Sequence, residues 1–292
     1  MYKIEASAKG LVTHGVSTCQ GCGLELIMRN VMEALGDDIV LVIPPGCAAM
    51  FSGSGIEGSV KVPGIQGNLE NSAAIASGIA NGFLHQGNTH TKVVAFAGDG
   101  ATVDIGLQAL SGAMERNENI LYICYDNEAY MNTGIQGSSS TPAGGWTTTT
   151  PSGKLGESKD LMRIVMAHDV PYAASASIAD LPDLRRKVKK ARDTTGTSVI
   201  HIQCPCPTGW GYPFAKSIEL AREAVQSGAW LLLEFENGKV KINREPKKLG
   251  ELDGYLKPQR RFRGMTDAQI DELRKGITAR YQLLKAETSI EG

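Results

Sequence analysis

The chain has 292 residues, 42% of them hydrophobic, and its 30 basic and 31 acidic side chains leave a formal net charge of −1. No basic block is interleaved with aromatic residues, which argues against nucleic-acid binding, and no apolar run is long enough to cross a bilayer. The segment 1–10 has no signal-peptide core, so we expect a cytoplasmic protein. In that reducing compartment the six cysteines favour metal ligands or buried thiols over disulfides.

Short apolar runs alternate with helical patterns along the first two thirds of the chain. The runs are typical of strands buried on both faces of a sheet and lie at residues 39–43, 93–97, 120–125 and 198–203. The helical patterns between them lie at residues 71–84, 104–117, 159–168 and 181–193. This alternation predicts an α/β protein with a doubly wound, mostly parallel sheet, whose ligands bind at the carboxyl ends of the strands.

Two segments depart from this alternation. Residues 134–156 are rich in Ser, Thr, Gly and Pro, and a loop of that length in a compact domain is either disordered or functional. From residue 229 the composition of the sequence changes, with basic stretches at 240–248 and 257–263 and a capped amphipathic helix pattern at 266–286. We therefore expect a domain of residues 1–228 and a C-terminal extension of residues 229–292. The extension either forms an arm on a partner or folds back on its own domain.

A small-residue turn follows the second predicted strand. The strand at 93–97 runs into Gly98-Asp99-Gly100, where backbone amides can approach phosphate oxygens. The next strand ends just before Asn127, and neighbouring parallel strands would place Asp99 and Asn127 side by side. A carboxylate and an amide oxygen suit a Mg²⁺ ion shared with a diphosphate. The alternative is that Asp99 caps a helix and Asn127 ends a strand.

Five of the six cysteines lie in loops or at strand ends. Cys19 and Cys22 form a C-x-x-C loop, Cys47 follows a Pro-Gly pair, and Cys204 and Cys206 follow the last predicted strand of the domain. Two thiolates from a C-x-x-C loop and two from remote loops can hold a cubane iron–sulfur cluster. The same residues could bind structural Zn²⁺, and a lone C-x-x-C could be a redox dithiol.

The strings that carry these residues resemble the beta subunits of pyruvate:ferredoxin oxidoreductases. They are GDGATVDIG at 98–106, YDNEAYMNTGIQ at 125–136, PCPTGW at 205–210 and GYLKPQRRF at 254–262, together with the C-x-x-C and Gly-Cys positions. The resemblance runs from about residue 16 to residue 284 and points to the thiamine-diphosphate-binding subunit of a 2-oxoacid:ferredoxin oxidoreductase. One departure is Gly137, which stands where members of the family often carry Arg and leaves the substrate open.

The resemblance implies three cofactors, namely thiamine diphosphate, Mg²⁺ and a 4Fe–4S cluster. Mg²⁺ would be held by Asp99, Asn127 and the carbonyl oxygen of Ala129. Asn132 would act as the catalytic residue beside the reacting end of the cofactor and the 2-oxoacid. The cluster ligands would be Cys19, Cys22, Cys47 and Cys206. The whole cofactor-binding set would be Gly46, Cys47, Gly98, Asp99, Gly100, Ala101, Asn127, Ala129, Tyr130, Asn132 and Thr133.

The remaining two cysteines are expected to have no cofactor role. We expect Cys204, two residues before Cys206, to point to the other side, and we interpret it as a bystander. Cys124 lies inside a hydrophobic strand and is expected in the core.

The family resemblance also implies a reaction and its partners. The reaction is the oxidative decarboxylation of a 2-oxoacid, with pyruvate and coenzyme A as the expected pair and 2-oxoisovalerate, or oxalate without coenzyme A, as alternatives. An alpha-type subunit would supply the pyrimidine-binding domain with its activating Glu. Gamma- and delta-type ferredoxin-like subunits or domains would pass the electrons to ferredoxin.

Two other classes of protein explain only part of the sequence. A non-redox thiamine enzyme would account for the Gly-Asp-Gly turn but not for the cysteines. A zinc-stabilised binding module would account for the cysteines but not for the pairing of Asp99 with Asn127.

Overall fold

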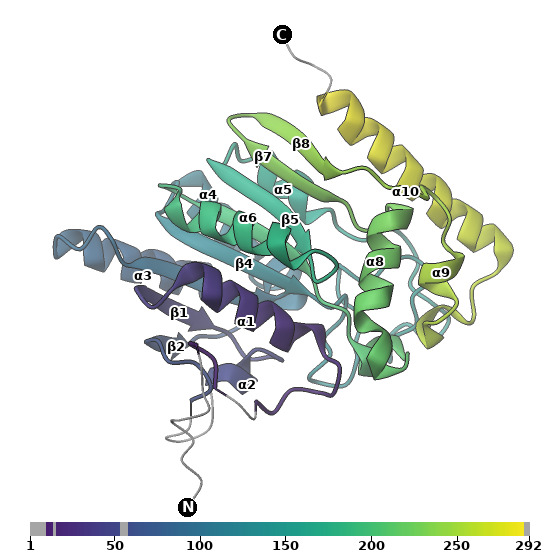
Figure 1. Cartoon of the computed structure of the whole chain (residues 1–292), viewed down its shortest axis with the longest axis horizontal. Coiled ribbons are helices and arrows are strands. Elements are labelled where there is room, and N and C mark those ends of the chain that lie inside the picture. Colours follow the sequence, from purple (N-terminus) through teal and green to yellow (C-terminus); the bar gives the residue numbers. More distant parts are fainter. Residues whose placement is uncertain (1–9, 14–15, 53–57, 289–292) are drawn as a thin grey trace, which may run out of the picture.

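A computed structural model describes residues 10–13, 16–52 and 58–288. Its centre is an eight-stranded sheet of order β2-β1-β3-β4-β6-β5-β7-β8 (Figure 1). The six strands from β2 to β5 run parallel, and β7 and β8 run antiparallel to their neighbours. In sheet order the strands are Gly64–Gln66, Ile39–Ile43, Lys92–Gly98, Ile120–Asp126, Ser198–Gln203, Tyr172–Ser177, Leu232–Glu236 and Lys239–Arg244.

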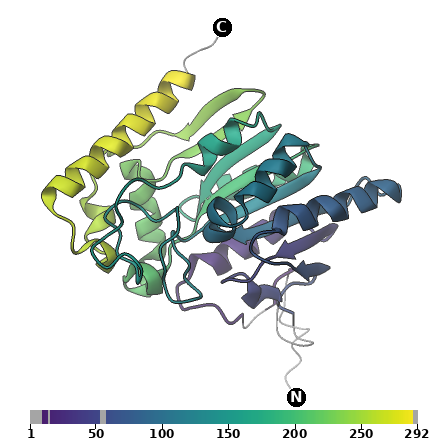
Figure 2. The same cartoon turned by 180° about the vertical axis from the view of Figure 1, so that it is seen from behind.

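Helices cover both faces of the sheet, which confirms the doubly wound, mostly parallel α/β fold. On one face, α1 (Gly23–Leu35) and α6 (Leu181–Asp193) lie over an apolar cluster of β1, β3, β4, β5 and β6 side chains (Figure 1). The opposite face carries α3 (Ser72–His85), α4 (Leu107–Glu115), α5 (Leu161–Met166) and α10 (Asp267–Thr288) (Figure 2). Among the described residues, no helix combines the length and the apolar character that a bilayer crossing needs.

The predicted strands and helices are present with small shifts at their ends. The helix expected at 104–117 begins later, because the chain first makes a π-helical turn over Gly100–Asp104. Strand β5 escaped prediction because its sequence, YAASAS, lacks the bulky apolar residues of a buried strand. The remaining α-helices of the described residues are α2 (Ala49–Ser52), α7 (Pro207–Trp210), α8 (Ser217–Ser227) and α9 (Asp253–Leu256).

The C-terminal extension folds back on its own domain, the second of the two alternatives. Strands β7 and β8 complete the sheet, and α10 packs over them with Tyr281 and Leu284 buried among sheet residues. The predicted cap of this helix is present, since the Gln269 backbone N–H donates to the Thr266 hydroxyl oxygen (3.3 Å) and the Thr266 backbone N–H donates to Gln269 Oε1 (2.8 Å). The described residues do not form an arm reaching away to a partner, because α10 has an apolar surface of the same chain to cover. The domain boundary at 228/229 stays a prediction.

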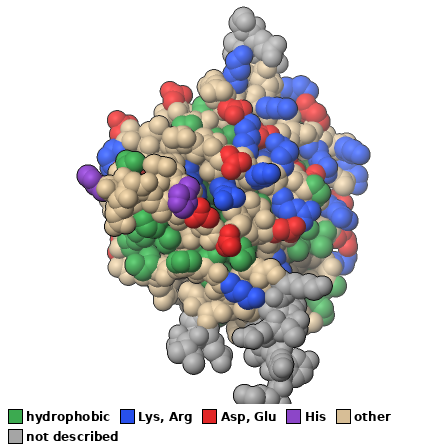
Figure 3. All heavy atoms as spheres, turned by 60° about the vertical axis from the view of Figure 1, so that its left-hand side comes forward, with side chains coloured by type: hydrophobic (Ala, Val, Ile, Leu, Met, Phe, Trp, Pro, Cys, Tyr) green, Lys and Arg blue, Asp and Glu red, His purple; other side chains and the backbone are tan. Residues whose placement is uncertain are grey.

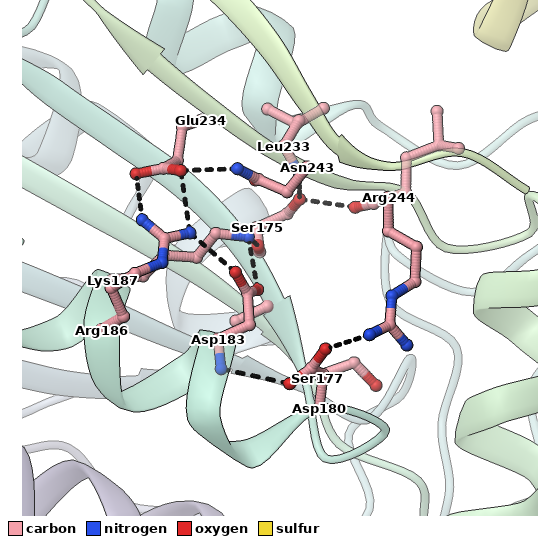
Figure 4. Close-up of polar contacts among 12 residues, drawn as sticks. Ser175, Ser177, Asp180, Asp183, Arg186, Lys187, Leu233, Glu234, Asn243 and Arg244 are labelled. Carbon is pink, nitrogen blue, oxygen red and sulfur yellow. Dashed lines mark hydrogen bonds and ion pairs between the residues drawn. The ribbon is translucent and has the colours of Figure 1, made fainter.

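A buried carboxylate, Glu234, fastens the antiparallel hairpin to the parallel part of the sheet (Figure 4). Arg186 of α6 donates to both of its oxygens at 3.0 and 2.9 Å. Tyr172 of β5 and Asn243 of β8 donate at 2.7 and 2.6 Å. Although burial opposes it, these hydrogen bonds lower the pKa of Glu234 from 4.5 to about 2.

We expect Glu234→Gln to lower the free energy of unfolding by about 2 kcal/mol at pH 7, because charge-assisted bonds from Arg186 are weakened. Because the folded-state pKa is depressed, the contribution of Glu234 is complete above pH 4.5 and is lost as the pH falls towards 2. Urea unfolding of both proteins at several pH values tests this. The control is Glu236→Gln on the same strand, whose ion pair with Lys190 is exposed and should matter little. A difference from wild type that does not shrink at low pH would contradict the assignment.

Candidate functional site

A single cleft at the carboxyl ends of β3 and β4 collects the predicted cofactor-binding residues. Every member of that predicted set lines the cleft, together with Pro45, Leu69, Tyr125 and Met131. Residues far apart in the sequence meet here because β1, β3 and β4 are parallel neighbours and the segments that follow them leave at the same edge. The cleft therefore has the position that the fold predicts for a ligand.

The turn after β3 is shaped for a close backbone approach. A Cβ atom on Gly100 would lie 2.2 Å from a ring carbon of Tyr130, and one on Gly106 would lie 2.1 Å from the Ala101 carbonyl oxygen. Only glycine fits at either position. The tight π-helical turn between them directs small residues towards the cleft, as a diphosphate requires.

Three groups proposed as Mg²⁺ ligands meet at the floor of this cleft. One terminal atom of the Asn127 side-chain amide lies 2.8 Å from the Ala129 carbonyl oxygen and 3.1 Å from Asp99 Oδ1. Two oxygens that bind one Mg²⁺ at right angles are about 3 Å apart, so this spacing suits the ion. The same spacing also suits the Asn127 amide nitrogen, which can donate to both the Ala129 carbonyl oxygen and Asp99 Oδ1.

The charge of Asp99 also fits a cation site. The side chain is only 1% exposed, and burial, followed by the neighbouring Asp126 carboxylate, raises its pKa well above the usual range. A buried carboxylate costs free energy unless a cation or hydrogen bonds compensate it. Asp99 accepts one short hydrogen bond, from the Ser138 hydroxyl at 2.5 Å, which leaves Oδ1 directed towards Asn127.

Residues 138–141, Ser-Ser-Ser-Thr, hold the acidic groups around this floor, and we call them the serine clasp. Ser138 donates to Asp99, Ser140 donates to Asp126 Oδ2 at 2.8 Å, and Thr141 donates to the Glu128 carbonyl oxygen at 2.7 Å. Lys154 fastens the clasp by donating to three of its backbone carbonyls at 2.6 to 3.3 Å. The long predicted loop is therefore built around the site.

We expect Ser138→Ala to weaken Mg²⁺-dependent binding of thiamine diphosphate by about tenfold, because a group that orients a metal ligand is removed. Ser139→Ala is the matched control, since Ser139 contributes its backbone N–H and carbonyl to the clasp. Calorimetric titration of each variant measures the affinity. Equal affinities for the two variants would show that Ser138 does not position Asp99.

The four cysteines predicted to bind a cluster lie near one another. Burial is the largest cause that raises the pKa of Cys47 to about 12. The negative charges of Cys206, Cys22 and Cys19 also raise the pKa of Cys47, in that order of size. Burial likewise raises the pKa of Cys206 to about 11, while its sulfur accepts the Gly209 N–H at 3.3 Å. Thiolates gathered in this way repel one another unless iron or another cation binds them, which fits a metal centre.

The spacing of these sulfurs differs from that of a single-ion site. Within the described part of the chain, no three cysteine sulfurs lie within 4.8 Å of one another. The thiolates of one tetrahedral Zn²⁺ are about 3.8 Å apart, as follows from Zn–S bonds of about 2.3 Å. A cubane cluster places four iron atoms between its ligands and therefore needs wider spacing.

Cys204 does not point away from this group. Its hydrogen bond with Cys22 is the largest cause that lowers the pKa of the Cys22 thiol to about 7, and Cys204 is itself 1% exposed. The predicted orientation was wrong because residues two apart in an extended segment point to the same side, so alternation does not separate Cys204 from Cys206. Which of the two is the fourth ligand stays a prediction. Cys124 is fully buried in the core, as expected.

A buried arginine of the C-terminal extension connects the two halves of the site. Arg261 pairs with Glu128 at 2.5 Å and lies over the Trp210 ring, 3.9 Å from its centroid. The Trp210 indole N–H donates to the Asn127 carbonyl oxygen at 2.8 Å, and Trp210 follows Cys206 in the same loop. The basic stretch 257–263 thus braces the Asn127 segment against the Cys206 loop.

A histidine that the sequence analysis did not single out supports the same floor. His201 of β6 forms a 2.7 Å hydrogen bond with Asp126 Oδ2 and packs against the Trp230 ring. Asp126 also accepts the Glu128 N–H at 2.9 Å. Asp126, His201 and the serine clasp therefore form one buried network directly behind Asn127.

Two predicted residues lie at the rim of the cleft. Asn132 and Thr133 are exposed, and Thr133 is held by a hydrogen bond to Gln136 at 2.6 Å. Gly137, at the position where the family often carries Arg, lies against the threonines of the long loop, so that a Cβ atom there would lie 3.3 Å from Thr147 Oγ1. Its N–H donates to Thr149 Oγ1 at 2.9 Å.

Comparison with known proteins agrees with this geometry. Residues 44–202 match the C-terminal TPP binding domain of thiamine pyrophosphate enzymes. The pyruvate synthase subunit PorB of Methanothermobacter thermautotrophicus is 46% identical over 272 residues, which cover 91% of this chain and 94% of that protein. The ketoisovalerate oxidoreductase subunit VorB of Pyrococcus furiosus is 45% identical over 293 residues, covering 95% and 93%.

A solved structure supports the fold independently. The 2-oxoglutarate:ferredoxin oxidoreductase from Magnetococcus marinus, determined with 2-oxoglutarate, coenzyme A and succinyl-CoA bound, superposes with a TM-score of 0.61. The match is 20% identical and covers 76% of this chain and 82% of that chain. At this level of identity the likeness concerns the fold.

Proposed function

Because the chain belongs to the thiamine-diphosphate-binding subunits of the 2-oxoacid:ferredoxin oxidoreductases, we propose that it converts pyruvate and coenzyme A to acetyl-CoA and CO₂. The electrons would leave through a 4Fe–4S cluster of this chain to ferredoxin, in the cytoplasm. One observation carries the proposal. Cys47, a proposed cluster ligand, lines the same cleft as Asp99, Asn127 and Ala129, the proposed Mg²⁺ ligands. A cofactor in that cleft would lie directly beside the cluster.

The residues of this chain would hold the Mg²⁺ ion, the diphosphate and the cluster, and would position the 2-oxoacid. Asp99, Asn127 and the Ala129 carbonyl would hold Mg²⁺, and the turn at Gly100 and Ala101 would bring backbone amides to the diphosphate. Asn132, at the rim, would reach the 2-oxoacid. Once bound, thiamine diphosphate supplies the electron sink for decarboxylation, and the cluster accepts single electrons. Cys19, Cys22, Cys47 and Cys206 would hold the cluster.

The substrate is proposed from relatives that differ in what they oxidise. By name, PorB belongs to a pyruvate synthase and VorB to a ketoisovalerate oxidoreductase, and their identities to this chain differ by a single percentage point, 46% against 45%. We choose pyruvate, with 2-oxoisovalerate as the second candidate. Oxalate without coenzyme A is a third. Gly137 bears on the choice of substrate, because it leaves the rim of the cleft without the arginine side chain that family members often carry there.

The chain would need partners to complete the site. An alpha-type subunit would bring the pyrimidine-binding domain and its activating Glu, and gamma- and delta-type ferredoxin-like subunits would receive the electrons. Apolar side chains exposed at the β2 and α3 side support such contacts, with Ile65 50% and Leu84 63% exposed. Figure 3 shows hydrophobic side chains gathered on that side of the molecule. Ile105, beside the cleft, is 45% exposed.

The experiment compares the complete complex with this subunit alone. Each would be supplied with iron, sulfide, Mg²⁺ and thiamine diphosphate, and viologen reduction would be followed with pyruvate, 2-oxoisovalerate and oxalate, with and without coenzyme A. We expect pyruvate with coenzyme A to support the fastest turnover of the complex, and the isolated subunit to be inactive. Faster turnover with another acid would overturn the substrate, and full activity of the isolated subunit would overturn the shared site.

A further inference from the structure

The side chain of Asn127 faces two different sites at once. One terminal atom of its amide lies 2.8 Å from the Ala129 carbonyl oxygen and 3.1 Å from Asp99 Oδ1. The other lies 3.9 Å from Cys47 Sγ. The amide is 5% exposed, and its two ends therefore connect the proposed Mg²⁺ ligands with a proposed cluster ligand.

The two ends of an amide differ chemically, so its orientation decides which site receives hydrogen bonds. If the nitrogen faces Asp99 and Ala129, it donates to two oxygens and presents its own oxygen to Cys47. If the oxygen faces them, three oxygens converge and the nitrogen donates to the Cys47 sulfur. A cation among the three oxygens stabilises the second orientation, and its absence stabilises the first.

The backbone around Asn127 is fixed, which leaves the amide as the part that can turn. The Trp210 indole N–H holds the Asn127 carbonyl at 2.8 Å, and Asp126 holds the next backbone N–H at 2.9 Å. On the other side, the segment after Cys47 is held by the Ala48 N–H, which donates to the Tyr125 hydroxyl at 3.1 Å. A half-turn of the amide exchanges N and O without moving any of these anchors.

We propose that Asn127 is a positioning residue that couples cation binding at the diphosphate site to the cluster. The inference rests on the proposed function, because it needs both the Mg²⁺ site and the cluster. Binding of Mg²⁺ with thiamine diphosphate turns the amide oxygen to the cation and delivers an N–H···S hydrogen bond to Cys47. Hydrogen bonds to cluster sulfurs stabilise the reduced, more negative cluster and raise its reduction potential. The cluster thus becomes a better electron acceptor when the cofactor is in place.

Cys206 provides an internal reference for this effect. Its sulfur accepts a backbone N–H from Gly209 at 3.3 Å, a bond that belongs to the first turn of α7 and involves no group of the Mg²⁺ site. This donor should be present with and without the cation. If adding the cation changes only one N–H donor near the cluster, that donor is therefore the Asn127 amide.

The test uses the full chain with its cluster reconstituted, reduced in D₂O, with and without MgCl₂ and thiamine diphosphate. Pulsed electron paramagnetic resonance should detect an additional exchangeable deuteron near the cluster on addition of both, and a redox titration should show a higher midpoint potential. Asn127→Asp keeps an oxygen ligand but has no N–H, so it should lack the additional deuteron. Calorimetry establishes that each protein binds the cofactor.

The outcomes separate the coupling from the function on which it rests. A wild-type chain that binds both cofactors and shows the same deuteron couplings and potential in both states would overturn the coupling alone. The same holds if Asn127→Asp gains the deuteron as the wild type does. A chain that takes up no iron, or a complete complex that binds no Mg²⁺ with thiamine diphosphate, would overturn the proposed function and the coupling with it.

Discussion

Asp99→Ala removes Mg²⁺-dependent binding of thiamine diphosphate and leaves the cluster in place. We expect the affinity to fall by more than about 100-fold, because loss of a direct ligand exceeds the 10- to 100-fold cost of losing a residue that only supports one. The buried Asp99 carboxylate is the one full negative charge among the three proposed ligand groups, so neither Asn127 nor the Ala129 carbonyl can replace it. Calorimetry in the complete complex measures the binding, and iron analysis measures the cluster.

The control for this variant is Asp37→Ala, which removes an exposed carboxylate in the turn before β1. It should bind the cofactor as the wild type does. If Asp99→Ala retained its full content of thiamine diphosphate, the assignment of Asp99 to the cation would be abandoned.

Cys206→Ser should lose the cluster, whereas Cys204→Ser should keep it. Cys206 caps the N-terminus of α7 and shares its surroundings with Cys22 and Cys19, whose charges act on its thiol. Serine at position 204 retains a hydroxyl that can replace the Cys204 hydrogen bond to Cys22. The two substitutions are chemically identical and two residues apart, so each serves as the control of the other.

Iron and sulfide contents and absorption at about 400 nm distinguish these variants after anaerobic purification. The wild type and Cys204→Ser should contain about four irons per chain, and Cys206→Ser close to none. The reverse result would make Cys204 the fourth ligand. Cys204 is the alternative to test because it is buried and forms a hydrogen bond with Cys22.

The floor of the site could be predicted because it depends on local sequence and strand order. Gly98-Asp99 and Asp126-Asn127 end consecutive buried runs, and parallel neighbours must bring such ends together. Gly98 is indeed paired with Tyr125 across the two strands, which places Asp99 beside the Asn127 segment. The same reasoning placed Cys47 after β1 and Cys206 after β6 at this edge.

The supporting network could not be predicted, because its members are brought together by folding from unrelated segments. Ser138 is one of many small polar residues in a long loop, and nothing in that loop distinguishes the serine that bonds to Asp99. Arg261 lies in a basic stretch whose sequence is typical of a solvent-exposed surface, yet Arg261 is 4% exposed and pairs with Glu128. A charge run is normally solvated, and only the tertiary position of Trp210 reveals why this arginine is not.

The error at Cys204 has another cause, a misapplied alternation rule. Residues two apart in an extended segment point to the same side, so the spacing gave no reason to turn Cys204 away from Cys206. The N-terminal loop that brings Cys22 into a hydrogen bond with Cys204 is placed by tertiary packing, which the spacing of the cysteines does not show.

We infer that this chain carries an iron–sulfur cluster immediately beside its thiamine diphosphate site. The most direct measurement is the metal and cofactor content of the anaerobically purified wild-type complex and of this chain isolated from it, by elemental analysis for iron and zinc and by assay of thiamine diphosphate. We expect about four irons on this chain, little zinc, and thiamine diphosphate that requires Mg²⁺ for retention. Zinc without iron on this chain, at an occupancy near one, would contradict it.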